Sequence, residues 1–177
     1  MQVEVVHSET AFRGRVFDVR QDQVRLPDER QVQYDVVEHN GSVTLIPLDE
    51  NGEIWFVRQY RHPAAGELLE LPAGVMNDNE DAEATAKREI REEIGMAARK
   101  LEPVGEFYLA PGYSTEYMVV FLATDLYPSP LQQDEDELLV VEKIHAAQAL
   151  KMAETGQFRD VKTLAALLLA RPRLKAM

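Results

Sequence analysis

The feature that most constrains this fold is a predicted amphipathic helix over residues 81–94, with apolar residues on one side and carboxylates on the other. Its apolar stripe repeats at helical spacing and has to pack against a sheet: Ala82, Ala86, Ile90 and Ile94. We expect Asn79 or Asp78 to be the N-cap and Gly95 to end the helix. One face of this helix is therefore core, and the opposite face is available as a site.

That opposite face carries Glu89, Glu92 and Glu93. Like charges three or four residues apart destabilise a helix by about 0.2–0.5 kcal/mol per pair, and the negative pole of the helix dipole adds to this cost. Arg88 and Arg91 relieve part of the repulsion, so a solvated face with ion pairs is the alternative interpretation. Three carboxylates are also hard oxygen ligands, suited to Mg²⁺ or Mn²⁺ rather than to zinc.

Composition removes several classes of function. The 177 residues carry a formal net charge of −12, which argues against a surface that binds nucleic acid through its phosphates. The absence of cysteine excludes disulfide scaffolds, thiolate zinc sites and thiol nucleophiles. The longest apolar runs, 117–123 and 164–170, are too short to span a membrane, and no signal peptide is visible. We therefore expect a cytoplasmic protein without a membrane partner.

Strand-like and helical segments alternate along the chain, which indicates an α/β or α+β fold with a mixed sheet. The strand-like runs are 15–24, 31–37, 42–47, 54–59, 67–72, 117–123 and 138–144, and further helices are predicted at 145–154 and 161–170. We expect 42–47 and 54–59 to form a hairpin around Asn51-Gly52. The last helix is expected to begin after Asp160 and to stop at Pro172.

The N-terminal strands suggest a division of the chain near residue 40, where Asn40-Gly41 separates strand-like runs. We therefore expect a small antiparallel β region over residues 1–40 and a larger domain over residues 41–177. A second acidic segment, residues 134–137, holds four consecutive carboxylates. For these four carboxylates, a solvated loop is favoured over a role as metal ligands.

A motif surrounds the acidic helix. Gly74 is followed, after five residues, by Glu80, and after seven more by the run 88–96, Arg-Glu-Ile-Arg-Glu-Glu-Ile-Gly-Met. The pattern resembles the Nudix box and matches each of its fixed positions. The resemblance implies an α/β/α sandwich with a mixed sheet. It also implies an enzyme that hydrolyses a nucleoside diphosphate linked to another moiety, using two or three Mg²⁺ ions, or Mn²⁺.

The resemblance also implies roles for individual residues. Glu89 and Glu93 correspond to the main metal ligands, with Glu92 as a third and the backbone carbonyl of Ala73 as another. A further carboxylate is required as general base for water attack on phosphorus. Either a box glutamate, Glu92, or a downstream residue, Glu116, fits that role.

Four other box residues correspond to structural positions in the family. Arg88 and Glu80 are expected to form an internal ion pair that orients the helix and its loop. Gly74 and Gly95 are expected to supply backbone geometry that other residues adopt with difficulty.

Residues outside the box resemble one branch of the family, the ADP-ribose pyrophosphatases. Pro111 lies sixteen residues after Gly95, and the same loop carries Glu116, which in that branch is a general base or extra metal ligand. Arg61 corresponds to a phosphate contact, and Glu70 to a residue of the substrate pocket. Tyr34 corresponds to an aromatic that stacks on adenine, often from the partner subunit.

The branch implies a homodimer in which the N-terminal strands are swapped between subunits. The expected reaction is Mg²⁺-dependent hydrolysis of ADP-ribose, or a related ADP-sugar, to AMP and a sugar phosphate. A pyrophosphatase acting on GDP-mannose or another nucleotide sugar is the first alternative. A Nudix domain that only binds nucleotide, as a sensor, is the second. A hydrolase of oxidised nucleoside triphosphates fits the N-terminal strands less well.

Overall fold

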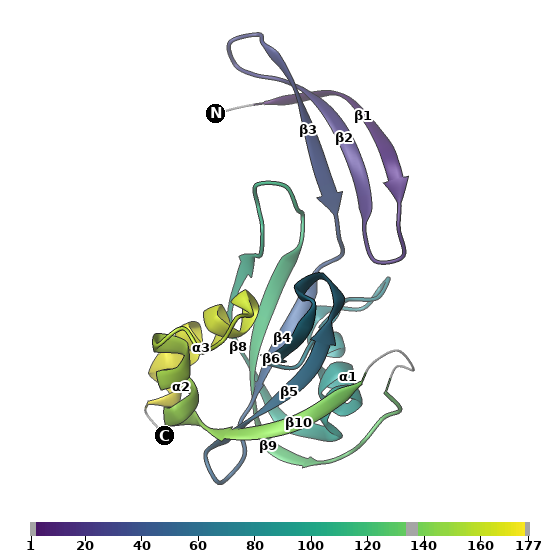
Figure 1. Ribbon diagram of the computed structural model, residues 1–177. Helices are drawn as coiled ribbons and strands as arrows, with labels where there is room; N and C mark the ends of the chain where they lie inside the picture. Colours follow the sequence, from purple (N-terminus) through teal and green to yellow (C-terminus); the bar gives the residue numbers. More distant parts are fainter. Residues whose placement is uncertain (1–2, 134–137, 176–177) are drawn as a thin grey trace. The chain divides into compact units, whose positions relative to one another are not determined.

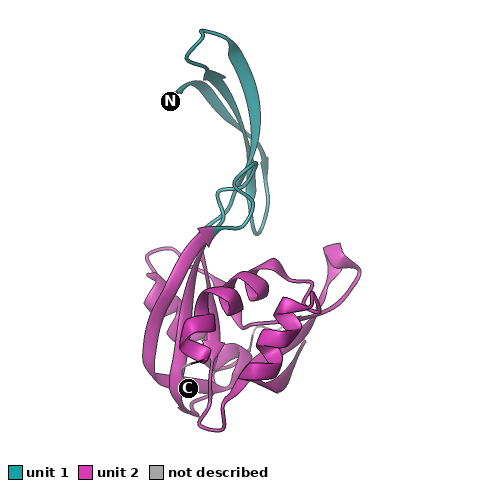
Figure 2. Ribbon diagram, turned by 90° about the vertical axis from the view of Figure 1, so that its left-hand side faces the viewer, with its two compact units in different colours: residues 1–41, 108–117 teal, residues 42–107, 118–177 magenta. Residues whose placement is uncertain are grey.

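The computed structural model describes residues 3–133 and 138–175, so the acidic run at 134–137 lies outside the described residues. The chain forms two compact units (Figure 2). One comprises residues 1–41 together with 108–117, and the other residues 42–107 with 118–177. The chain therefore returns to the N-terminal unit through a late segment.

The N-terminal unit is a three-stranded antiparallel sheet in the order β1-β2-β3. Its strands are β1 (Glu4–Arg13), β2 (Asp18–Arg25) and β3 (Gln31–Glu38). The segment 108–117 is attached to β3 by backbone hydrogen bonds of 2.7 Å from Val37 N–H to the Tyr113 carbonyl and 3.0 Å from Thr115 N–H to the Val37 carbonyl. The antiparallel sheet agrees with the expected fold, although β1 was not predicted as a separate strand.

In its described residues, the larger unit holds two sheets and three α-helices. The four-stranded sheet has the order β7-β4-β9-β8 and the three-stranded sheet the order β10-β5-β6. The strands are β4 (Ser42–Pro47), β5 (Glu53–Arg61), β6 (Gly66–Glu70), β7 (Ala73–Val75), β8 (Met96–Tyr108), β9 (Tyr117–Pro128) and β10 (Leu139–His145). The helices are α1 (Ala82–Ile94), α2 (Ala146–Glu154) and α3 (Val161–Leu174), with a short 3₁₀ helix at His62–Ala64. Strand β4 is parallel to β9 and antiparallel to β7, which confirms the mixed sheet.

Helices cover both faces of these strands, with α1 on one side and the α2–α3 pair on the other (Figure 1). One core cluster joins Val43 and Leu45 of β4 to Ala86, Ile90 and Ile94 of α1. The other joins the opposite face of the strands to α2 and α3, through Ile46, Phe56, Val120, Ala149 and Leu167. The layers therefore form the expected α/β/α sandwich. Within the described residues, no helix is both long enough and apolar enough to cross a membrane.

The expected hairpin between β4 and β5 was wrong. The turn exists, with Gly52 at φ 74°, but only an isolated bridge joins Leu48 to Ile54, and the two strands continue into different sheets. Asp49 stabilises the turn by accepting hydrogen bonds from Asn51 N–H and Glu53 N–H. Because these bonds satisfy the turn locally, the fully buried β4 and the largely buried β5 are free to take their partners elsewhere in the chain.

Two predicted helix ends also differ. The N-cap of α1 is Asp81, whose carboxylate accepts a 2.7 Å hydrogen bond from Ala84 N–H, rather than Asn79 or Asp78. Asn79 adopts a left-handed conformation in the preceding loop, with φ 66°. Helix α3 continues through Pro172 to Leu174, so the proline lies inside its last turn instead of stopping it. The predicted caps at Gly95 and Asp160 are confirmed.

Candidate active site

Helix α1 buries two of its glutamates. Ile90 and Ile94 direct the helix into the core, and the neighbouring face carries Glu89 and Glu93, which are 8% and 1% exposed. A buried carboxylate costs several kcal/mol of desolvation unless it is paired, so these side chains require donors or cations around them. Burial of both glutamates is stronger than the amphipathic pattern predicts, because that pattern places them outside the apolar stripe.

Strand β7 lies directly against these carboxylates. Ala73 N–H donates a 3.0 Å hydrogen bond to Glu93 Oε2. A Cβ added at Gly74 would lie only 1.8 Å from Oε1 of Glu89, so any side chain there would collide with the carboxylate. Glycine at this position is thus explained by close approach, and the backbone of Ala73 and Gly74 forms one wall of the carboxylate site.

Arg88 connects the helix to its preceding loop. Its guanidinium donates from Nε and Nη2 to the two carboxylate oxygens of Glu80, at 3.0 and 2.9 Å. Its Nη1 donates to Glu89 Oε1 at 2.6 Å and to Glu92 Oε2 at 2.8 Å, and Nη2 also reaches the Val75 carbonyl at 3.1 Å. One cation therefore lies among three carboxylates and fixes the loop on the helix.

The electrostatics follow from this arrangement. Hydrogen bonds from Arg88 lower the pKa of Glu80 from 4.5 to about 2, against the opposing effect of burial. The same carboxylate accepts a bond from Asn77 N–H, which also favours its ionised form. The pKa of Arg88 is raised, principally by its hydrogen bonds to Glu80. At the end of the helix, Gly95 has φ 69°, and its N–H closes the last turn onto the Ile90 carbonyl.

Arg61 and Glu70 form a second charged group in the larger unit: each is the last residue of its strand, in an antiparallel register that places Arg61 opposite Gly66 and Glu70 opposite Val57. Arg61 Nε and Nη2 donate to the two oxygens of Glu70 at 2.9 and 2.8 Å. Glu70 also pairs with Lys162 in the first turn of α3, a residue that was not predicted from the sequence. The only signal in the sequence was its place two residues after the N-cap Asp160, which does not identify a buried partner.

Glu116 and Tyr34 belong to the N-terminal unit. Glu116 is partly buried in the segment 108–117, where its N–H donates to Ser114 Oγ at 3.2 Å and its carbonyl accepts from Leu109 N–H at 3.1 Å. Tyr34 lies on β3, opposite Asp22 of β2, and is 49% exposed. The structure thus brings the box residues together in the larger unit, which also contains the pair of Arg61 and Glu70. Glu116 and Tyr34 belong to the N-terminal unit.

The donor set is that of a hard cation. In the described part of the chain, no three acidic or histidine side chains are grouped so as to hold a metal ion, and Arg88 engages both Glu89 and Glu92. Those two carboxylates nevertheless meet at a single cationic nitrogen, Nη1 of Arg88, and the missing side chain at Gly74 leaves room for the carboxylate of Glu89. By charge, burial and ligand chemistry, Glu89, Glu92 and Glu93 fit Mg²⁺ or Mn²⁺.

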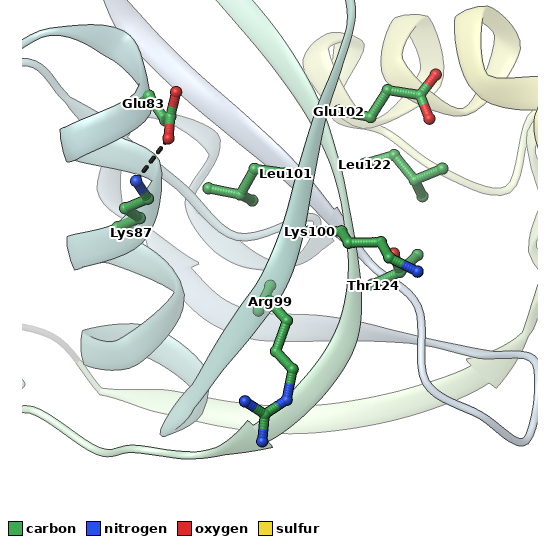
Figure 3. A pocket seen from close by; sticks show the side chains of 9 residues that line it. Glu83, Lys87, Arg99, Lys100, Leu101, Glu102, Leu122 and Thr124 are labelled. Carbon is green, nitrogen blue, oxygen red and sulfur yellow. Dashed lines mark hydrogen bonds and ion pairs between the residues drawn. The ribbon is translucent and has the colours of Figure 1, made fainter.

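A surface hollow of about 400 Å³ lies elsewhere on the larger unit, between α1, β8 and β9. Its lining includes Glu83 and Lys87 of α1, which pair at 2.5 Å, and Arg99 and Lys100 of β8 (Figure 3). None of the sequence-predicted site residues lines this hollow. The candidate site is therefore defined by the buried carboxylates, and not by this hollow.

Two known protein families match most of the chain. Residues 38–167 match the NUDIX domain, and residues 3–37 match the nucleoside diphosphate sugar hydrolase N-terminal domain. An ADP-ribose pyrophosphatase of Bacillus subtilis is 34% identical over 171 residues, covering 94% of this chain and 91% of that protein. A GDP-mannose pyrophosphatase of Yersinia pestis is 32% identical over 158 residues, covering 84% and 78%.

A crystal structure of an ADP compounds hydrolase superposes with a TM-score of 0.89, at 26% identity, over 99% of this chain and 96% of that one. The fold is an α/β/α sandwich. Its loop–helix–loop presents a carboxylate site, made by the glutamates of α1 and by the glycine wall, which is the backbone of Ala73 and Gly74. With the match over residues 38–167, the chain belongs to the Nudix family.

Proposed function

We propose that this protein hydrolyses the pyrophosphate bond of ADP-ribose, or a related ADP-sugar, to give AMP and a sugar phosphate. The observation that carries the proposal is the buried pair Glu89 and Glu93 behind the glycine wall at Gly74. A pure nucleotide-binding sensor has little use for repelling carboxylates whose burial is costly. The relatives named above support a nucleoside diphosphate sugar as the substrate.

In this proposal Glu89, Glu93 and Glu92 hold two or three Mg²⁺ ions, or Mn²⁺, with the carbonyl of Ala73 as a further ligand. Bound Mg²⁺ would neutralise the pyrophosphate oxygens and lower the pKa of a coordinated water. The strand and helix of the chain hold the carboxylates at one place, and Arg88 keeps the loop closed around them. Glu116, or alternatively Glu92, serves as general base.

The remaining roles concern the substrate. Arg61 binds a phosphate through the donors that its pairing with Glu70 leaves available, since a guanidinium matches phosphate geometry. Tyr34 stacks on the adenine from the partner subunit, for which its exposed ring is suited. A cytoplasmic location fits a substrate of this kind and belongs to the same proposal.

The test of the proposal is a panel of nucleotides assayed with Mg²⁺ and with Mn²⁺ for released phosphomonoester. We expect kcat/KM to be highest for ADP-ribose or another ADP-sugar, with GDP-mannose slower and nucleoside triphosphates slowest. A higher kcat/KM for GDP-mannose would favour the first alternative. Tight binding of ADP-ribose without turnover of any nucleotide would favour the sensor.

We also propose that the N-terminal unit forms a homodimer. Its strand β1 is exposed along its whole length, and the unit carries apolar side chains that a monomer would leave in water. These side chains are Val3, Val5, Val6, Phe12, Val16 and Phe17, each more than 40% exposed. A second copy of the same sheet is an occupant that would cover an apolar surface of this kind.

Size-exclusion chromatography with light scattering tests the dimer. From a chain mass of 20.1 kDa we expect a particle of twice that mass. Phe12→Asp should shift the particle toward one chain, because it places a charge in the covered surface. Lys151→Met, on an exposed part of α2, serves as the control and should leave the dimer intact. A wild-type particle of one chain would contradict the proposal.

A further inference from the structure

Four charged side chains meet between the end of β5 and the first turn of α3: Arg61, Glu70, Asp160 and Lys162. Glu70 is 1% exposed and Lys162 8% exposed, so two opposite charges are buried together. Lys162 Nζ pairs with Glu70 and also donates to Asp160 at 2.9 Å. The group is neutral in sum, which is a condition for placing charges in an interior.

Arg61 is the open member of this group. Its Nε–Nη2 edge is engaged by Glu70, and its side chain is 41% exposed. Among the described residues, none accepts a hydrogen bond from its Nη1. The carboxylate thus fixes the plane of the guanidinium and leaves further donors for an anion, which is the preorganised form of an arginine site.

This arrangement requires Glu70 to stay ionised while buried. Burial raises the pKa of Glu70, but hydrogen bonds and charges from Arg61 and Lys162 outweigh it, so that the pKa is lowered overall. A phosphate on the remaining donors of Arg61 would share the charge of the guanidinium with Glu70. A second cation that never leaves Glu70 would keep that carboxylate charged and in place when Arg61 binds phosphate.

Lys162 has the fixed position that this role needs. Asp160 is the N-cap of α3, and its Oδ2 accepts from Thr163 N–H at 3.0 Å and from Thr163 Oγ1 at 2.6 Å. Thr163 Oγ1 in turn accepts a 2.8 Å hydrogen bond from Leu71 N–H, next to Glu70 in the chain. The first turn of α3 therefore holds both the lysine and the backbone that carries Glu70.

We infer that Lys162 is a positioning residue for phosphate binding: it holds Glu70 in place, and Glu70 orients Arg61 toward the substrate pyrophosphate. The inference rests on the proposed function, because the phosphate contact of Arg61 belongs to that proposal. Lys162 itself is buried and contacts no substrate in this account. Its loss should therefore weaken binding rather than slow the chemical step.

The experiment is a double-mutant cycle of Lys162→Met and Arg61→Met. Two quantities are measured for each protein: KM and kcat for ADP-ribose with Mg²⁺, and the Kd for inorganic pyrophosphate by calorimetry without metal. Lys162→Met should raise both KM and Kd about tenfold, the change expected for losing one charged hydrogen bond, with kcat nearly unchanged. In the Arg61→Met background, the same substitution should have no further effect on either constant.

Equal losses in both backgrounds, or an unchanged Kd, would overturn the inference, since a purely structural lysine would act independently of Arg61. Lys151→Met is the matched control and should change neither constant. If circular dichroism shows that Lys162→Met does not fold, Lys162→Gln, which keeps a donor without the charge, enters the same cycle. Failure of wild type to turn over ADP-ribose would refute the proposed function, while the pyrophosphate Kd would still decide the role of Lys162.

Discussion

Glu93→Gln is expected to lower kcat for ADP-ribose by about a thousandfold, which corresponds to about 4 kcal/mol of transition-state stabilisation. Glutamine keeps the shape of the side chain and can still accept the hydrogen bond from Ala73 N–H. It removes the negative charge that a divalent cation requires. Because Glu93 is 1% exposed, losing its charge also removes a desolvation cost, so the fold should be retained.

The control for this prediction lies on the same helix. Glu83→Gln changes an exposed glutamate that pairs with Lys87 at the surface, and kcat should stay within about twofold of wild type. Steady-state kinetics with Mg²⁺, together with thermal unfolding of each variant, make the comparison. Full activity of Glu93→Gln would contradict the assignment of Glu93 as a metal ligand. Equal losses in both variants would point to a nonspecific effect of charge on the helix.

Arg88→Met is expected to lower the free energy of unfolding by about 3 kcal/mol in the absence of divalent cations. The substitution removes the guanidinium that pairs with Glu80, Glu89 and Glu92, and it leaves these partly buried carboxylates without that cation. Mg²⁺ should restore part of the loss if the carboxylates hold it, because binding to the folded state alone stabilises that state. Chemical denaturation with and without Mg²⁺ measures both effects.

The matched control is Lys87→Met, which removes a cation from the exposed side of the same helix and should cost no more than about 0.5 kcal/mol. A loss of the same small size for Arg88→Met would show that Arg88 is not the centre of the site.

The pH dependence of stability gives a second comparison between wild type and Arg88→Met. The folded pKa of Glu80 is lowered to about 2, so its stabilising contribution is present above pH 4.5 and is lost as the pH falls toward 2. Arg88→Met should lack that acid-side loss.

Helix α1 was the most predictable part of the fold. The apolar stripe at Ala86, Ile90 and Ile94 defines its buried face, and the box spacing predicts which carboxylates lie beside it. These features are local in sequence, with a period that a single helix imposes. Both the ion pair of Arg88 with Glu80 and the glycine wall at Gly74 involve residues within one short motif.

Long-range pairing could not be predicted in the same way. The turn at Gly52 predicts a hairpin, but β4 pairs with β7 and β9, because its fully buried residues can pack between two strands distant in sequence. Strand β8, which spans Met96–Tyr108, contains Pro103 and no regular alternation, so its sequence does not indicate a strand of that length. Lys162 was missed for a related reason, since its partner Glu70 is 92 residues away.

The most direct test of the account is to identify the products formed from ADP-ribose by the wild-type protein. We expect AMP and ribose 5-phosphate in equal amounts, formed with Mg²⁺ and not in the presence of EDTA, and almost none with Glu93→Gln. Absence of both products from the wild-type reaction, or their formation in EDTA at the same rate, would contradict the central claim that buried carboxylates of α1 support metal-dependent cleavage of a pyrophosphate bond.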